Sequence, residues 1–308
     1  MKIEIVLTES EIAQEIAESM EARDLPEKSF YWFTRSVQAW LALSGDGSYE
    51  PLNRCWQTVA ESIAAVTAHF PAAVPVISLG SGEGARDRMV LKALRDAGRD
   101  VRYFPVDASQ PLLELACAAA EDDDIETSGI KADISSPVHL VYCSDAAEPP
   151  RLFLMAGGTL GSFDPLDQIR HLAQSMREGD RLVVDGEIHG ESTLKGRTEP
   201  IVVRWATAPF DSMGITPEDG ELRLEERHDE RHEGLHLVVR HFRANRDVRA
   251  MVFGNEIPMQ RGERISMNFQ YVYDPKAFRW LIEEHAGLKL VDAIPSPDGR
   301  FLAAVCSK

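Results

Sequence analysis

The sequence is short of several features, and each shortage argues against a class of protein. Its four cysteines are scattered without CxxC spacing, which argues against a zinc ribbon and a disulfide scaffold. Basic residues are outnumbered, with 33 Lys and Arg against 50 Asp and Glu, so the formal net charge is −17. Such a field repels DNA or RNA but not a small cationic or zwitterionic ligand. We therefore expect a small-molecule substrate and no nucleic-acid partner.

Long hydrophobic runs are also absent, and no apolar window is long enough to cross a bilayer. The first nine residues carry one early cation and no apolar run, which predicts neither a signal peptide nor a membrane span. Together with the scattered cysteines, these features favour a reducing, cytoplasmic location. The 308 residues, 44% of them hydrophobic, are enough for a well-buried core, whereas the sequence leaves the oligomeric state open.

Short apolar runs alternate with helical patterns between residues 71 and 190. The apolar runs cover residues 74–79, 101–107, 151–155 and 181–185, and the helical patterns cover 87–97, 111–121 and 164–176. This alternation is typical of βαβ units, in which helices cover both faces of a parallel sheet. The sequence therefore predicts an α/β fold with a Rossmann-like core over residues 71–190.

The flanking segments have a different character. Residues 1–70 contain helical patterns and an aromatic cluster, and we expect them to form the helical part of a second, substrate-binding lobe. Residues 191–272 are expected to complete that lobe as a β-rich insertion, with strands at 201–205, 235–242 and 266–273. Residues 273–308 are expected to return to the core as a helix and an antiparallel hairpin.

A glycine-rich turn follows the first predicted core strand. Gly80, Ser81, Gly82 and Gly84 lie between that strand and a helix, where glycine lets a ligand approach the backbone, although an ordinary tight turn has the same composition. Asp107 closes the next strand, where nucleoside-binding folds place a carboxylate on the ribose hydroxyls. The GxGxG spacing differs from the dinucleotide pattern GxGxxG and is typical of class I methyltransferases. We therefore expect S-adenosylmethionine as the cofactor.

Several segments, in order along nearly the whole chain, resemble the histidine-specific Nα-methyltransferases of ergothioneine biosynthesis and their fungal relatives that methylate a prenylated tryptophan. Residues 105–109, PVDAS, are similar to the family's PVDVS, and residues 156–163, AGGTLGSF, are similar to its GSTIGN turn. The other similar segments are residues 25–31, 79–86 and 262–273. The resemblance implies a Rossmann-like class I fold and an S-adenosylmethionine-dependent methyltransferase activity.

The resemblance also implies roles for individual residues. The cofactor would be lined by Gly80, Ser81, Gly82 and Gly157. Asp107 would bind its ribose, and Arg86 would pair with the carboxylate of its methionine moiety, although the position of Arg86 alone is equally compatible with a solvated charge. Asp133 lies where an acid would contact the adenine, or it is a solvated loop acid.

The residues expected to face the methyl acceptor depart from the family. Ser162 replaces an asparagine of the turn, while Asn268 and Gln270 replace a glutamate and a serine that recognise imidazole. A carboxylate only accepts hydrogen bonds, whereas an amide donates and accepts. We therefore predict a small amine or amino acid other than histidine as the substrate, held by Tyr31, Ser162, Asn268 and Gln270.

Two further patterns have more than one interpretation. Asp185 and Glu187 follow the fourth core strand and either hold a cationic amine or cap the end of the sheet. Residues 232–236 spell HExxH, but Gly234 interrupts the pattern and a strand follows, so we predict neither a metalloprotease nor a metal site.

Three alternatives to methyl transfer stay open. A related enzyme could use the same cofactor to cyclise its aminobutyrate chain, which would leave methylthioadenosine in place of S-adenosylhomocysteine. A nicotinamide-dependent oxidoreductase is disfavoured by the GxGxG spacing. A cofactor sensor without catalysis would bind S-adenosylmethionine and release neither by-product.

Overall fold

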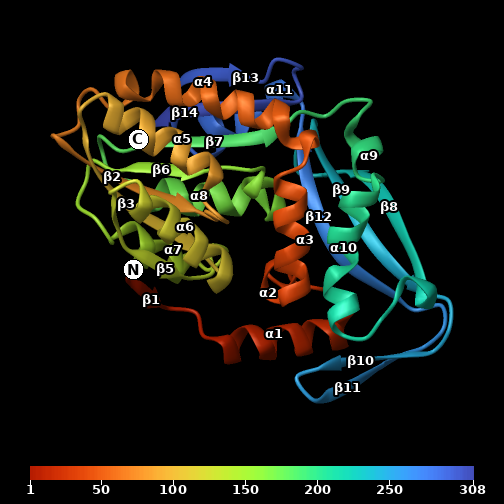
Figure 1. Ribbon diagram of the computed structural model, residues 1–308. Coiled ribbons are helices and arrows are strands. Elements are labelled where there is room, and N and C mark those ends of the chain that lie inside the picture. Colours follow the sequence, from red (N-terminus) through yellow and green to blue (C-terminus); the bar gives the residue numbers. More distant parts are fainter.

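A nine-stranded sheet forms the centre of the computed structural model, which describes residues 1–308 (Figure 1). Its strands are β1 (Ile3–Ile5), β2 (Ala73–Leu79), β3 (Asp100–Asp107), β4 (Glu126–Thr127), β5 (Gly129–Lys131), β6 (Leu152–Met155), β7 (Arg181–Glu187), β13 (Lys289–Pro295) and β14 (Phe301–Ser307). Their order is β1-β5-β3-β2-β6-β7-β14-β13, with β4 beside β3. All pairs up to β7 are parallel, whereas β14 is antiparallel to both of its neighbours. The predicted α/β core and the returning hairpin are confirmed.

Helices cover both faces of this sheet. One face packs against α4 (Glu50–Val66), α5 (Ala85–Asp96) and α6 (Gln110–Asp122), and the other against α7 (Pro137–Ser144), α8 (Pro165–Ser175), α11 (Pro275–Trp280) and a π-helical turn, Leu281–His285. The central strands are apolar on both sides because both sides are buried; Val76 and Ile77 of β2 are each 0% exposed. None of the helices combines the length and the apolar character that a membrane span needs.

A second lobe packs beside the carboxyl ends of the core strands (Figure 1). Its helices are α1 (Glu9–Ala22), α2 (Ser29–Trp32), α3 (Thr34–Ser44), α9 (Thr193–Gly196) and α10 (Pro200–Ser212). Its strands are β8 (Gly220–His228), β9 (Leu235–Ala244), β12 (Arg264–Tyr273) and the hairpin β10 (Val248–Val252) and β11 (Asn255–Met259). The sheet β12-β9-β8 is antiparallel throughout, and an apolar cluster joins it to the N-terminal helices.

The N-terminal segment contributes to both parts of the molecule. Its first strand, β1, extends the core sheet by pairing with β5, and α4 packs on α5 and β14 of the core. The stretch between them, α1 to α3, belongs to the apolar cluster of the second lobe. The predicted domain boundary at residue 70 stays a prediction.

The strand predicted at residues 201–205 is wrong. This segment lies in α10, which packs against α3. Its β-branched run suggests a strand, but Trp205, Ala206 and Phe210 are buried at helical spacing, and Pro200 starts the first turn. The helical period and the packing against α3 outweigh the β-propensity of three residues.

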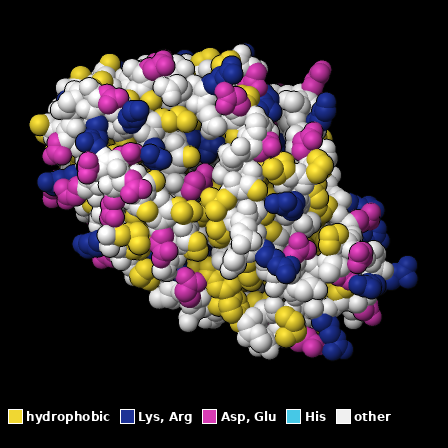
Figure 2. All heavy atoms as spheres, in the orientation of Figure 1, with side chains coloured by type: hydrophobic (Ala, Val, Ile, Leu, Met, Phe, Trp, Pro, Cys, Tyr) yellow, Lys and Arg dark blue, Asp and Glu magenta, His cyan; other side chains and the backbone are white.

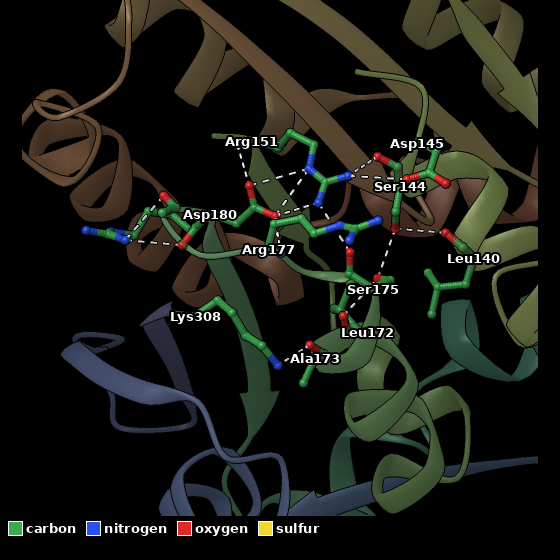
Figure 3. Close-up of polar contacts among 12 residues, drawn as sticks. Leu140, Ser144, Asp145, Arg151, Leu172, Ala173, Ser175, Arg177, Asp180 and Lys308 are labelled. Carbon is green, nitrogen blue, oxygen red and sulfur yellow. Dashed lines mark hydrogen bonds and ion pairs between the residues drawn. The ribbon is translucent and has the colours of Figure 1, made fainter. Parts of the chain in front are cut away.

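A buried ion pair fastens the amino-terminal edge of the sheet (Figure 3). Arg151 precedes β6 and Asp180 precedes β7; Nη2 of Arg151 lies 2.7 Å from Oδ2 of Asp180, and their side chains are 1% and 0% exposed. The guanidinium also donates to the carbonyls of Ser144 and Ser175, at the ends of α7 and α8. This network joins two strands and two helices at the edge opposite the second lobe.

Candidate cofactor and acceptor site

A cavity of about 420 Å³ lies where the carboxyl ends of the core strands meet the second lobe. Ligands of open parallel sheets bind at this edge, because the loops that follow the strands converge there. All seven residues predicted to bind the cofactor line the cavity: Gly80, Ser81, Gly82, Arg86, Asp107, Asp133 and Gly157. The loops after β2, β5 and β6, together with β3 and α5, therefore bring the predicted cofactor residues together.

Two glycine turns form the floor of the cavity. Gly80 has a φ of +74°, and a Cβ on it would lie 2.8 Å from Cγ2 of Thr159, so a side chain there would be strained and would collide. The opposite turn is held by Asp185, which is 0% exposed and accepts hydrogen bonds from the backbone N–H groups of Gly157 and Gly158 at 2.8 and 2.6 Å.

Asp185 and Glu187 are both occupied by protein partners. Asp185 also accepts a hydrogen bond from the indole Nε1 of Trp56 at 2.6 Å. Glu187 forms a two-pronged ion pair with Arg197, at 2.8 and 3.1 Å. Of the two roles that the sequence suggests for these acids, the structure favours support of the sheet end over binding of an amine.

Asp107 is oriented at the edge of the cavity by the backbone. Its Oδ2 accepts from the N–H of Gly82 and its Oδ1 from the N–H of Ser109, both at 2.8 Å. Burial raises the pKa of this carboxyl to about 6, although those N–H groups act in the opposite direction. An ionised carboxylate offers about four lone-pair sites, so Asp107 keeps acceptor capacity for a ribose diol.

Arg86 carries a buried charge that forms no hydrogen bond or ion pair with a protein anion. The residue is 7% exposed, its Nε has no hydrogen-bond partner, and its guanidinium lies 5.1 Å from the ring centroid of Tyr49. A Cβ on Gly157 would lie 3.7 Å from Nη1 of Arg86, so the cation borders the second glycine turn. Because a buried unpaired charge is unfavourable, this arrangement suits the carboxylate of an incoming ligand.

Two polar contacts join the lobes at the rim of the cavity. Nζ of Lys28 lies 2.5 Å from Oδ2 of Asp133, and Trp40 donates its indole N–H to Glu83 at 3.0 Å. Although burial opposes it, the Lys28 ammonium lowers the pKa of Asp133 below its usual value. Asp133 is therefore a partly buried, paired acid that lines the cavity, not a solvated loop residue.

The wall that the second lobe contributes to the cavity contains an acid that the sequence did not single out. Glu27 accepts a hydrogen bond from the hydroxyl of Tyr31 at 3.2 Å, and both residues line the cavity with Ser162. Burial raises the pKa of Glu27 to about 7, although Tyr31, Ser162 and Arg240 oppose the shift. The available signal was a carboxylate four positions before Tyr31, inside residues 25–31, one of the segments that resemble the family.

The remaining residues predicted to hold the acceptor lie just behind the cavity wall. Gln270 accepts from the Ser162 hydroxyl at 3.2 Å and donates to the carbonyl of Gly158 at 2.9 Å, so it joins β12 to the second glycine turn. Asn268 accepts from Arg240 at 3.1 Å. Of the four residues predicted to hold the acceptor, Tyr31 and Ser162 line the cavity, and Gln270 contacts it through Ser162.

Aromatic side chains form part of the cavity wall. Tyr31 and Trp40 line the cavity and meet edge to face, with 5.2 Å between ring centroids. They also pack on the apolar cluster of the second lobe, so they serve as both lobe core and cavity wall. Phe163 and Phe269 complete the apolar part of the lining.

Comparison with known proteins identifies one matching family and several relatives. Residues 10–189 match the family described as histidine-specific methyltransferase, SAM-dependent. Histidine N-alpha-methyltransferases from Mycolicibacterium smegmatis and Mycobacterium tuberculosis are 31% and 29% identical to this chain over 118 residues. That region is 37% of this chain and 36% of each relative.

Among solved structures, an S-adenosylmethionine-dependent methyltransferase from Clostridium acetobutylicum is similar to this chain with a TM-score of 0.46 and 12% identity. The match covers 86% of this chain and 94% of that protein.

Proposed function

The chain belongs to the family of histidine-specific, S-adenosylmethionine-dependent methyltransferases, and from this we propose that it methylates the amine of a small amine or amino acid other than histidine. The predicted family and the cofactor class are thereby confirmed. One observation carries the proposal for this chain: a single cavity is lined by both the residues predicted to bind the cofactor and the carboxylate of Glu27.

The cofactor end of the cavity fits S-adenosylmethionine group by group. Asp107 offers a carboxylate to the ribose hydroxyls, and the unpaired guanidinium of Arg86 offers a partner to the carboxylate of the methionine moiety. The glycine turns leave room for the ligand against the backbone. When bound, the cofactor supplies an electrophilic methyl group on a sulfonium.

At the acceptor end, the residues must bring an amine into line and remove its proton. An ammonium group has no lone pair, so it must lose a proton before it attacks a methyl carbon. A carboxyl with a pKa of about 7 binds an ammonium in its ionised form and accepts that proton near neutral pH. The hydroxyl of Tyr31 holds Glu27 in place, and close alignment of donor and acceptor supplies much of the rate enhancement.

We propose that the acceptor is an amino acid or amine with a flat or apolar portion. The ring of Tyr31, whose hydroxyl donates to Glu27, lines the cavity, as do Phe163 and Phe269. The strand position where the family carries an imidazole-recognising glutamate is Asn268, which is already bonded to Arg240. Histidine would therefore find no second carboxylate to recognise its ring, and we expect it to be a poor substrate.

The decisive experiment screens amino acids and small amines for the by-product released by the wild-type chain. Release of S-adenosylhomocysteine with a methylated amine supports the proposal, and Glu27→Gln should retain cofactor binding but lose turnover. Release of methylthioadenosine would indicate cyclisation, and cofactor binding without any by-product would indicate a sensor. Efficient turnover of histidine would refute the proposed specificity.

We also propose a cytoplasmic protein without a nucleic-acid partner. All four cysteines are buried free thiols, which suits a reducing compartment. On the face drawn in Figure 2, Lys and Arg are interspersed with Asp and Glu and form no continuous basic patch. With a net charge of −17, this surface does not favour a polyanion.

A further inference from the structure

Two histidines and a glutamate converge outside the catalytic cavity, where the core sheet meets the sheet of the second lobe. His189 follows β7, Glu226 is on β8 and His236 is on β9, and one ligand atom from each lies within 4.8 Å of the others. None of the three lines the cavity. The HExxH pattern does not account for the cluster, because the ring of His232 instead stacks on Trp280 at 3.7 Å.

The buried member of this cluster has a nitrogen without a partner. His236 is 5% exposed, and its Nε2 lies 3.1 Å from Oδ1 of Asp274. Because the carboxylate only accepts, Nε2 must donate, which leaves the lone pair of a neutral ring on Nδ1. This Nδ1 makes no hydrogen bond and lies 4.0 Å from Oε1 of Glu226. This ring nitrogen and the carboxylate oxygen are both acceptors, so a cation placed between them would be stabilised by both.

We propose that His189, Glu226 and His236 bind a divalent first-row transition metal ion, with Zn²⁺ as the type case. Two imidazoles and one carboxylate are a recurrent ligand set for such ions. Nε2 of His189 lies 2.7 Å from Oε1 of Glu226 and donates to it in the metal-free chain, so coordination requires the other tautomer of this ring, with its proton on Nδ1. The side chains of His189 and Glu226 are 29% and 28% exposed, which leaves room for water at the remaining coordination positions.

Coordination requires one local movement. The rings of His189 and His236 stack with 3.8 Å between centroids and 10° between planes, so the in-plane directions of their nitrogens run parallel. A tilt of the partly exposed His189 ring, together with the change of tautomer, would make two lone pairs converge. Asp274 orients His236 from behind, which is the usual arrangement of a carboxylate, a histidine and a metal. The bound ion would join the end of β7 to β8 and β9 and so stabilise the junction of the two lobes.

The test uses the full chain without a histidine tag, stripped of metal by a chelator. Zn²⁺ is titrated by calorimetry, Co²⁺ by its absorption spectrum, and the melting temperature is measured with and without Zn²⁺. We expect one ion per chain and a rise in melting temperature. Glu226→Gln should weaken Zn²⁺ binding by more than the roughly 10–100-fold expected for Asp274→Asn, which removes only an outer partner.

Glu225→Gln is the matched control, because Glu225 is on the same strand, carries the same charge and pairs with Arg227 outside the cluster. His189→Ala gives a second ligand variant on a half-exposed residue, should the buried His236→Ala variant fail to fold. Absence of saturable Zn²⁺ binding, or equal Zn²⁺ affinity in the Glu226→Gln and Glu225→Gln variants, would overturn the proposal. Because the cluster lies outside the cavity, affinity for S-adenosylmethionine should be the same in all these variants, whatever the outcome for methyl transfer.

Discussion

Two buried arginines at opposite edges of the central sheet have contrasting surroundings. Arg151, at the amino-terminal edge, is 1% exposed and pairs with Asp180 and two backbone carbonyls (Figure 3). Arg86, at the carboxyl-terminal edge, is 7% exposed, has an unpartnered Nε and lies against a tyrosine ring. One arginine therefore completes the fold, and the other offers its charge to a ligand.

The same contrast extends to the acids at the two edges. Asp180 is enclosed by four donor groups of Arg151 and Arg177. Glu27 and Asp107, at the cavity, have pKa values raised by burial to about 7 and about 6. When the charge of a group has few partners in the free protein, a ligand of opposite charge or with hydrogen-bond donors stabilises that charge most. Incomplete compensation of charge thus distinguishes Arg86, Asp107 and Glu27 from the paired acids that support the fold.

The largest effect is expected at the fully paired edge. Arg151→Met would leave Asp180 as an uncompensated buried charge, and we expect a loss of about 3–5 kcal/mol in the free energy of unfolding. Urea denaturation measures this loss of stability. Arg181→Met is the control, because Arg181 is half-buried and its side chain forms hydrogen bonds only to backbone carbonyls and to the ring of His69. A loss below about 1 kcal/mol, within the range of a surface ion pair, would contradict the structural role.

Glu27→Gln should give the largest change in activity. Removal of a general base costs about 100-fold or more in rate. Because Glu27 must be ionised to accept a proton, the wild-type kcat/KM should rise as the pH increases through about 7, the raised pKa of this carboxyl. In the Glu27→Gln variant, kcat/KM should no longer rise through about pH 7 and should depend on pH only through deprotonation of the substrate amine. A pH–rate profile that is the same in both proteins would exclude Glu27 as the base.

Arg86→Met should separate binding from stability. Loss of a hydrogen bond to a charged group costs about 1.5–3 kcal/mol, so affinity for S-adenosylmethionine should fall by roughly 10- to 150-fold. The free energy of unfolding should stay the same or increase, because an unpaired buried charge is removed, in contrast to Arg151→Met. Arg88→Met is the control on the same helix, because Arg88 is exposed and pairs with Asp123. Equal cofactor affinity in the two variants would remove Arg86 from the cofactor site.

The features that the sequence predicts well are local. The strand, the turn and the candidate ligand-binding residues lie within a few positions of one another in the apolar runs that end in GxGxG or in Asp107. Because the carboxyl ends of parallel strands lie at one edge of the sheet, these residues line one cavity. The features that it predicts poorly depend on distant partners. Ile201 to Trp205 form a helix because α3 offers an apolar face, and the environment of Glu27 depends on Ser162 and Arg240 from elsewhere in the chain.

The smallest effect should come from Tyr31→Phe, which removes one hydrogen bond from Glu27 and leaves the aromatic wall in place. The Tyr31 hydroxyl donates to the carboxylate at 3.2 Å, and this bond opposes the pKa rise caused by burial. Without it, the charged form is less stable, so the midpoint of the rising limb should move upward from about 7. A neutral donor contributes about 0.5–1.5 kcal/mol, which corresponds to a shift of roughly 0.4–1 pH unit. Measured at a pH well above both midpoints, the two proteins should differ little in kcat, because Glu27 is then ionised in each. A shift to lower pH, or a loss of rate that high pH does not restore, would show that Tyr31 acts on the acceptor itself and not through Glu27.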